Sequence, residues 1–218
     1  MPRLFELSKP ATNRLNHTVN IKPFTIDALK LRAKGDKQPA IEIIPGQIIT
    51  RRKQVQVNVR DGLVMPDIGR DILKGVVVER HKTTGNIGLG LVTGFGLKQG
   101  ALASSTAHDS HNIVAIGTSD GDIFTAVKEV ERLQGGLVVA AGGKVLGSLA
   151  TPIAGLLSEE PLEKVVKGLE GLEQAARELG TTLPSPFAAL SFLALPVIPE
   201  LRLTDLGLVD VNEFKLIK

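Results

Sequence analysis

Short runs of apolar residues, separated by turn-forming residues, fill the first two thirds of the chain. Residues 55–59 alternate apolar and polar side chains, which predicts a strand with one face toward solvent. Residues 74–79 contain the continuous run Val76-Val77-Val78, which is typical of a strand buried on both faces. In residues 85–100 glycine is too dense for a stable helix, so this stretch predicts a strand and turns. Further strands are predicted at 41–44, 48–50, 113–117, 137–141 and 144–149, the last two as a hairpin.

Helical signals begin after residue 118. A helix over residues 122–133 has capping residues just before it, in Ser119-Asp120-Gly121-Asp122. A second helix is predicted to start at the cap Ser158, with Pro161 in its first turn and Gly180 after its end. Its apolar residues recur at helical spacing and are predicted to face the core; they are Leu162, Val165, Val166, Leu169, Leu172, Ala176 and Leu179.

The C-terminal part completes the predicted fold. A third helix is predicted over residues 186–195, and residues 201–210 alternate around a turn as a hairpin that returns to a sheet edge. Because strands with hairpin signals dominate and the helices gather late, the sequence predicts an α+β fold, with a mixed, largely antiparallel sheet and two or three helices packed on it. Residues 1–39, polar and punctuated by proline, are predicted to form an N-terminal arm on a domain of residues 40–218.

Composition narrows the function classes. Of the 218 residues, 43% are hydrophobic and 22% are charged, which is enough apolar material for a real core. The net charge of +3 comes without Trp or Tyr to stack on bases, so we do not expect nucleic-acid binding. The absence of cysteine removes disulfides and thiolate chemistry. No uncharged apolar run reaches the roughly 18 residues of a membrane span, and we expect a cytoplasmic protein that does not bind membranes.

Polar chemistry concentrates in the segment His108-Asp109-Ser110-His111-Asn112, hereafter the histidine loop, which holds two of the four histidines. The segment precedes the apolar run 113–117, so it is predicted to lie at the entrance of a buried strand, where loops often carry function. The alternative is a hydrogen-bonded turn, in which Asp109 and Asn112 bond backbone amides.

Metal binding is one chemistry that this segment suggests. The spacing of His108 and His111 would let both imidazoles address one metal ion, with Asp109 as a ligand or as the partner that orients a ring. Two histidines do not complete such a site, so the missing ligands would come from His81, Glu79 or another polypeptide. Glu79 and His81 also follow the run Val76-Val77-Val78, at a predicted strand end, and would serve acid–base chemistry if a pocket shifted their pKa values; the alternative is a surface ion pair.

Several stretches also resemble one known family. They are Asp71-Ile72-Leu73-Lys74, Val78-Glu79-Arg80-His81, Gly94-Phe95-Gly96-Leu97-Lys98-Gln99-Gly100-Ala101, Ala103-Ser104-Ser105, the histidine loop with Ala107, Gly135-Gly136, Pro152-Ile153-Ala154-Gly155-Leu156, residues 190–199 and residues 203–210. Together they span about residues 40–214, and over that length the chain resembles the C-terminal domain of microbial adenine deaminases, members of the amidohydrolase superfamily.

The resemblance implies hydrolysis of adenine to hypoxanthine and ammonia, with a metal-activated water attacking the ring carbon that bears the amino group. In this family the metal ligands lie mainly on a preceding (β/α)8 barrel that carries a His-x-His pair, and this chain has no His-x-His sequence. The resemblance therefore implies a barrel partner, as a domain or a subunit, and a divalent metal (manganese, iron or zinc) in the complete enzyme.

The resemblance also assigns a place to the polar residues. The histidine loop, with Glu79 and His81, is expected to line the purine pocket or to support the metal site across the domain interface. Which of these residues contacts adenine stays open. Two other functions remain as alternatives, a stand-alone purine-binding module without catalysis and a metal-binding structural protein. Assembly into homo-oligomers is also left open.

Overall fold

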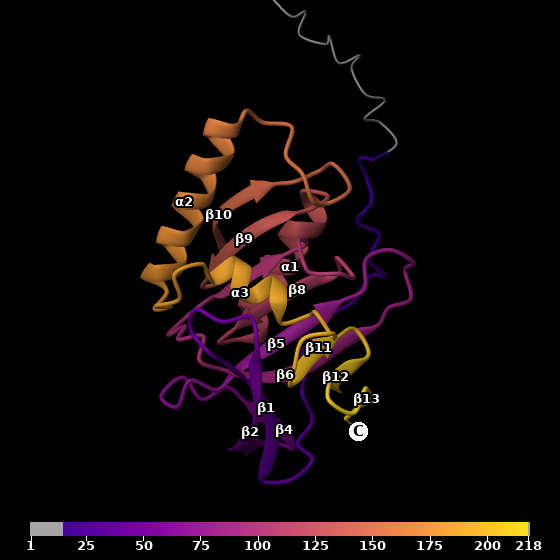
Figure 1. The fold of residues 1–218 in the computed structure, drawn as a ribbon, viewed down its shortest axis with the longest axis vertical. Helices are drawn as coiled ribbons and strands as arrows, with labels where there is room; N and C mark the ends of the chain where they lie inside the picture. Colours follow the sequence, from indigo (N-terminus) through magenta and orange to yellow (C-terminus); the bar gives the residue numbers. More distant parts are fainter. Residues whose placement is uncertain (1–14, 218) are drawn as a thin grey trace, which may run out of the picture.

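An eight-stranded sheet forms the centre of the computed structural model, which describes residues 15–217 (Figure 1). Its strands, in spatial order, are β10 (Lys144–Ala150), β9 (Gly136–Ala141), β7 (Ala101–Ser104), β8 (Ile113–Gly117), β5 (Leu73–Val78), β6 (Ile87–Thr93), β1 (Lys37–Ile43) and β2 (Thr50–Gln56). Neighbouring strands are antiparallel, except that β1 and β6 are parallel. The predicted α+β fold with a mixed, largely antiparallel sheet is confirmed.

Apolar layers cover both faces of this sheet. The other elements are α1 (Asp120–Arg132), α2 (Leu162–Glu178), α3 (Pro186–Phe192), a sheet of β11 (Leu201–Thr204), β12 (Gly207–Asp210) and β13 (Lys215–Leu216), the hairpin of β3 (Asn58–Arg60) and β4 (Leu63–Met65), and the 3-10 helix η2 (Ile26–Leu29). α2, α3 and β11 pack on one face, whereas α1 and the segment that holds Val19, Ile21 and Leu29 pack on the other. Each face therefore has a core of its own.

The strand β5 shows how the two cores are built. It lies between β8 and β6, and its six residues are all buried, as the continuous apolar run predicts. Val77 contacts the core under α2 and α3, whereas Val76 and Val78 contact the core under α1. Successive side chains of a strand point to opposite faces, so a strand covered on both faces is apolar at most positions. The exception in β5 is Lys74, which is buried and pairs with Asp120.

Several predicted elements are confirmed with small shifts. α1 begins at Asp120, two residues earlier than predicted, and its N-cap is Ser119, whose Oγ accepts the Asp122 N–H at 3.1 Å. The β9–β10 hairpin lies where the sequence predicts it. α3 begins at Pro186 as predicted and ends at Phe192.

The start of α2 was predicted wrongly. Pro161 is its N-cap, and Ser158 instead accepts the Glu160 N–H within the preceding turn. The apolar stripe of this helix is core only in its C-terminal half, because the first turns extend past the edge strand β10 (Figure 1). Leu162 is 73% exposed and Val166 is 46% exposed, whereas Leu172, Ala176 and Leu179 are buried.

The C-terminal hairpin also differs from the prediction. Residues 201–210 do form the antiparallel pair β11–β12, but with β13 they make a separate sheet rather than joining an edge of the central one. This small sheet lies across the face of β5 and β6, where Gly75, Gly88 and Gly90 leave room for it: Cβ atoms at these positions would lie within 3.4 Å of hairpin atoms. Alternation in the sequence predicts a strand but does not identify the surface that the strand covers.

Two strand predictions near the N-terminal side were wrong in extent. Residues 48 and 49 lie in the connection between β1 and β2 and are exposed. Residues 55–59 do not form one strand, because β2 ends at Gln56 and β3 begins at Asn58 in a different sheet.

Residues 15–36 belong to the predicted N-terminal arm and cover the α1 face of the sheet through Val19, Ile21 and Leu29. The predicted arm boundary at residue 39 falls inside β1, and residues 1–14 lie outside the described part. None of the helices in residues 15–217 is both long enough and apolar enough to cross a membrane.

Candidate functional site

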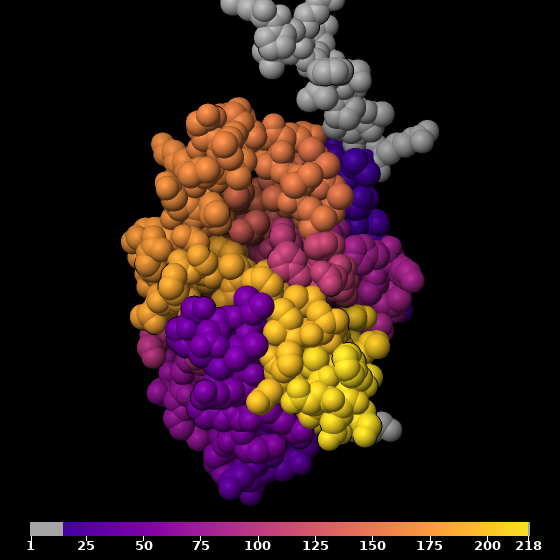
Figure 2. All heavy atoms as spheres, in the orientation of Figure 1, coloured from indigo at the N-terminus to yellow at the C-terminus, as the bar shows by residue number. Residues whose placement is uncertain are grey.

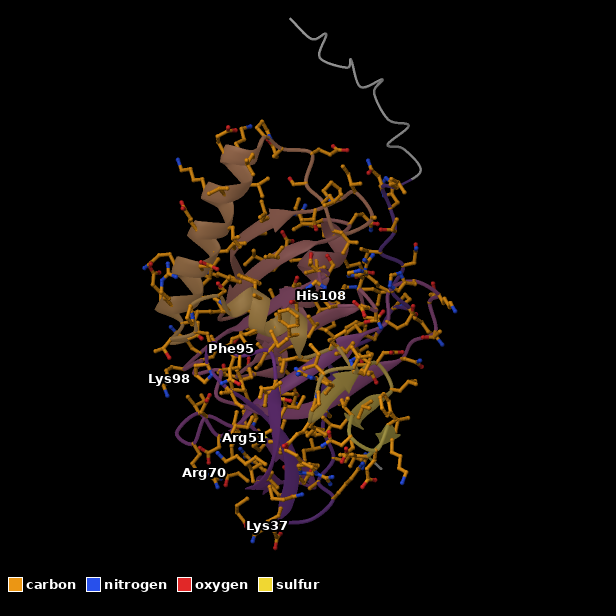
Figure 3. All side chains as sticks on the ribbon, in the orientation of Figure 1. Lys37, Arg51, Arg70, Phe95, Lys98 and His108 are labelled. Atoms are coloured by element: carbon orange, nitrogen blue, oxygen red, sulfur yellow. The ribbon has the colours of Figure 1, made fainter. Side chains whose placement is uncertain are left out.

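The histidine loop lies between β7 and β8, directly before β8, where the sequence predicts it. Figure 3 shows His108 at the middle of the face that carries α3. The half-buried His108 ring lies with its centroid 5.0 Å from that of Phe192 and 6.3 Å from that of His111. Aromatic rings at these separations are in contact, so the two imidazoles and Phe192 form one aromatic cluster.

His111 occupies an uncommon backbone conformation, with φ at +50°, and its N–H donates to the Ala107 carbonyl at 2.7 Å. Its Nδ1 is buried and has no hydrogen-bond partner within residues 15–217. Burial above all, and then the nearby Arg80 guanidinium, lowers the pKa of His111. The ring is therefore neutral at pH 7, with one nitrogen as donor and the other as acceptor.

Arg80 joins three segments of the chain around the loop. This side chain is 1% exposed. Its Nε donates to the His111 carbonyl, Nη1 to the Thr18 carbonyl at 3.3 Å, and Nη2 to the Ala154 carbonyl at 3.0 Å. Burial lowers the pKa of Arg80, and no carboxylate of the described residues pairs with it. Backbone carbonyls, together with the Thr18 hydroxyl, therefore hold this buried charge.

Asn112 anchors the other end of the histidine loop. Its Nδ2 donates to Asp205 Oδ1 at 3.4 Å, and its Oδ1 accepts the Arg80 N–H at 3.4 Å. Asp205 lies in the turn between β11 and β12 and also accepts from Asn86 Nδ2 at 3.0 Å. The C-terminal hairpin is thereby tied to the start of β8.

Glu79 and His81 hold the neighbouring turn. His81 Nε2 lies 2.8 Å from the Ser110 carbonyl. Glu79, buried at 7% exposure, accepts the N–H groups of His81, Lys82 and Thr84 and the Thr84 hydroxyl. Burial alone would raise the pKa of Glu79, but these hydrogen bonds outweigh it and lower the pKa to about 2. The carboxylate therefore stays ionised at neutral pH.

Glu79→Gln is expected to weaken the folded state at neutral pH and to have a smaller effect at pH 3. The folded pKa of about 2 lies below the ordinary 4.5, so the carboxylate contributes stability above pH 4.5 that is lost as the pH falls toward 2. The difference at neutral pH should be up to about 3 kcal/mol in the free energy of unfolding. Urea unfolding between about pH 3 and pH 7 measures it. Glu170→Gln, at an exposed position of α2, is the control, and an equal effect of Glu79→Gln at both pH values would contradict the assignment.

An apolar groove of about 250 Å³ begins next to this aromatic cluster. Phe192, which contacts His108, forms one wall together with Ala188 of α3, and Ile44 and Ile48 form the other. The groove therefore places apolar surface directly beside an imidazole.

Arg202 holds the walls of this groove. It is 1% exposed and donates to the carbonyls of Phe192 at 2.9 Å, Ile48 at 2.6 Å and Ile198 at 2.7 Å. Burial lowers the pKa of Arg202 to about 10. Figure 2 shows the violet segment after β1 lying against α3 and the yellow segment that leads into β11. Ile48, which lines the groove, is 50% exposed, and Val197, which does not line it, is 61% exposed.

The described residues do not make a metal centre by themselves. Across residues 15–217, no three His, Cys, Asp or Glu side chains lie close enough together to hold a metal ion. His108 and His111 would supply at most two ligands, and Asp109 is exposed. A complete site would need ligands from outside this part of the chain.

Residues 47–215 match the family model described as the adenine deaminase C-terminal domain. The chain belongs to this family. The resemblance that the sequence predicts is confirmed by a match over most of the chain.

Several curated relatives of this chain are named adenine deaminase. The chain is 56% identical over 214 residues to the adenine deaminase of Dehalococcoides mccartyi (strain ATCC BAA-2266 / KCTC 15142 / 195), which is 98% of this chain and 38% of that protein. It is 52% identical to the Desulfatibacillum aliphaticivorans enzyme, over 96% of this chain and 36% of that protein. Against the Brucella abortus (strain 2308) enzyme it is 45% identical, over 98% and 37%. The chain thus spans little more than a third of the length of these relatives.

In this adenine deaminase C-terminal domain, the structure brings together most of the residues that sequence reasoning selected. His81, His108 and His111 lie around one turn, whereas Glu79 is bound within the adjacent turn and Asp109 and Ser110 face outward. Sequence reasoning missed the supporting roles of three residues, which are Arg80, Phe192 and Asp205. All three lie in the stretches that carry the family resemblance, which was the available signal.

Proposed function

We propose that this domain works in the cytoplasm as part of an enzyme that converts adenine and water to hypoxanthine and ammonia. In this proposal, a (β/α)8 barrel, as a preceding domain or a separate subunit, supplies the metal site, and the histidine loop forms one wall of the purine pocket. Two findings support the proposal: the chain belongs to this family, and its relatives are named adenine deaminases. The chain spans 38% of the length of the Dehalococcoides protein.

The aromatic cluster at the mouth of the apolar groove is the observation that carries the proposal. His108 and Phe192 offer ring surfaces at a centroid distance of 5.0 Å, and a flat purine ring suits such a surface. In this proposal the neutral His111 imidazole uses its Nε2 to bind the polar edge of the ring, because its Nδ1 is buried. The exposed apolar side chains Ile48 and Val197 are covered by the barrel in this proposal.

The metal ligands belong to the partner in this proposal, because the described residues bring no three ligands together. A bound divalent metal (manganese, iron or zinc) supplies an activated water in such enzymes. This chain's own contribution is to orient the purine and to exclude water. His81 and Glu79 keep the loop in place, His81 through its contact with the Ser110 carbonyl.

The test combines the purified chain with the barrel part of an adenine deaminase relative. We expect neither protein alone to release ammonia from adenine and the mixture to do so. In the mixture, His108→Ala should lower kcat/KM by about 100-fold, the scale of a positioned imidazole. His17→Ala is the matched control, because His17 is exposed and lies outside the loop.

Three results would contradict the proposal or favour an alternative. Full activity of the mixture with His108→Ala would mean that the histidine loop is only a hydrogen-bonded turn without a role in catalysis. Full activity of the isolated chain would remove the need for a barrel. Adenine binding by the isolated chain in calorimetry, without turnover in any mixture, would favour a purine-binding module.

A further inference from the structure

The central sheet ends in two edge strands, β2 and β10, and the chain covers only the first of them. At the β2 edge, the Thr50 N–H donates to the Pro199 carbonyl at 3.0 Å, and the Glu200 N–H donates to the Thr50 carbonyl at 3.1 Å. At the other edge, β10 pairs with β9, and no backbone group of residues 15–217 bonds to its outer side. Within the described part of the chain, β10 is therefore an open edge.

The pairing with β9 identifies the peptide groups on this open edge. The Thr151 N–H, directly after β10, donates to the Gly135 carbonyl on the β9 side at 2.9 Å. Peptide groups of an antiparallel strand point alternately to one neighbour and to the other. The N–H and C=O groups of Ser148 and Ala150 therefore point outward, away from β9.

The side chains of β10 do little to block pairing with another strand. Its one charged residue is Lys144, at the first position, and the strand contains no proline. Val145 and Leu146 are 39% and 54% exposed. Edge strands that stay unpaired commonly carry charges or proline. A bulge interrupts β10 between Val145 and Gly147, so its regular open part is residues 147–150.

The helix α2 extends past this edge on one face of the sheet (Figure 1). Its C-terminal end lies near the start of β7, since a Cβ on Gly100 would lie 2.8 Å from Leu179 Cδ1. Further toward its N-terminus the helix lies over β10, since a Cβ on Gly168 would lie 3.1 Å from Leu149 Cδ1. The preceding helix residues 162–167 add about 9 Å of length. Because neighbouring strands lie about 4.8 Å apart, these first turns extend over the place of one more strand.

Apolar side chains on these first turns face that place without cover. Leu162 is 73% exposed and Val166 is 46% exposed. With Leu146 of β10, they put apolar surface beside outward-pointing peptide groups. An additional strand at this edge would bond the peptide groups and bury the apolar side chains together, which is a recurring mode of protein recognition.

The charges around this edge favour a second copy of the same chain as the occupant. Lys144 lies at the start of β10, whereas Glu159 and Glu163 follow its end, in the segment that leads into α2 and in its first turn. None of these three residues forms an ion pair within residues 15–217. Antiparallel pairing of two β10 strands brings the start of each strand to the end of the other. Lys144 of each copy thereby comes to the acidic end of the other copy.

We propose that two copies of this chain form a dimer by antiparallel pairing of their β10 strands. With the twofold axis at Ser148, the N–H and C=O groups of Ser148 in the two copies bond to each other, and Gly147 lies opposite Leu149 of the other copy. An axis perpendicular to the sheet keeps both α2 helices on one face, so Leu162 and Val166 lie over the other copy's β10. Such a contact closes on itself, and the covered β2 edge adds no further copies, so the product is a dimer rather than a fibre.

The test is sedimentation equilibrium of the full chain over a range of concentrations. We expect a monomer–dimer equilibrium with a dissociation constant of about 10 µM or lower. Leu162→Asp should raise this constant at least about tenfold, because it puts a charge into the apolar contact. Since Leu162 is 73% exposed, the variant should unfold at the same urea concentration as the unmodified chain. Leu206→Asp, at a 64% exposed position between β11 and β12, is the matched control and should leave the dimer unchanged.

A charge exchange tests the antiparallel arrangement itself. Lys144→Glu should weaken the dimer, because acidic groups of the two copies then meet. Adding Glu159→Lys and Glu163→Lys to this variant should restore the dimer, because opposite charges then meet again. Damage to the fold by Lys144→Glu would not be repaired in this way.

Three results would overturn the proposal. They are a chain that stays monomeric at about 100 µM, a dimer as tight in Leu162→Asp as in the unmodified chain, and a triple charge variant no tighter than Lys144→Glu. If the chain alone were monomeric and Leu162→Asp abolished its binding to the barrel, this surface would dock the barrel and the dimer would be refuted.

This surface is separate from the proposed purine pocket. None of its residues belongs to the histidine loop or lines the groove beside Phe192. Adenine deamination by the mixture with a barrel is measured independently, so either proposal can fail without the other.

Discussion

Replacing Gly88 by alanine is expected to lower the free energy of unfolding by about 3 kcal/mol. A Cβ atom on Gly88 would lie 1.8 Å from the Thr204 carbonyl oxygen and 2.9 Å from the Gly207 nitrogen. Both are backbone atoms of the β11–β12 hairpin, so no change of side-chain rotamer relieves the overlap. The hairpin would have to lift from the sheet and expose the buried Leu203. Urea unfolding measures the loss.

Two other glycines provide matched comparisons for this experiment. At Gly90 the nearest contact of a Cβ would be the end of the Leu208 side chain at 2.9 Å, which can move, so Gly90→Ala should cost less than Gly88→Ala. At Gly171, exposed in α2, a Cβ meets nothing within 4 Å among the described residues, and Gly171→Ala should raise stability by up to about 1 kcal/mol. If Gly88→Ala unfolded at the same urea concentration as the unmodified chain, the packing of the hairpin on β6 would be refuted.

The elements that the sequence predicts best are those whose local pattern has only one structural solution. A continuous apolar run such as that of β5 has to be covered on both faces, and the N-cap of α1 lies within the capping segment 119–122 that the sequence predicts. At α2 two local signals compete, Ser158 and Pro161, and the chain uses the proline. The exposure of Leu162 could not be predicted from helical periodicity, because it depends on where the sheet ends.

The position of the C-terminal hairpin illustrates information that a single sequence does not contain. Gly75 lies on β5 and Gly88 and Gly90 lie on β6, and only the β5–β6 pairing brings the three onto one face. The same limit applies to the candidate site. The histidine loop was placed correctly before β8, but its contacts Arg80, Phe192 and Asp205 come from distant parts of the chain. Arginine side chains are seldom fully buried, so the sequence did not predict a structural role for Arg80.

Arg80→Met is expected to lower the free energy of unfolding by about 3 kcal/mol or more and to raise the pKa of His111. Methionine fills much of the space, but it leaves the carbonyls of His111 and Ala154 buried without their donor. It also removes a positive charge that disfavours the protonated form of His111. Urea unfolding measures the first effect, and a titration of the His111 ring by nuclear magnetic resonance measures the second.

Arg202→Met separates the charge of Arg80 from general loosening of the fold. Arg202 is equally buried and likewise bound to backbone carbonyls, but it is not among the groups that shift the pKa of His111. We therefore expect a similar loss of stability with the pKa of His111 unchanged. An equal rise of that pKa in both variants would mean that burial alone keeps the ring neutral. In Arg80→Lys the charge is retained while the fork of hydrogen bonds is lost, so its His111 pKa should stay low although its stability falls.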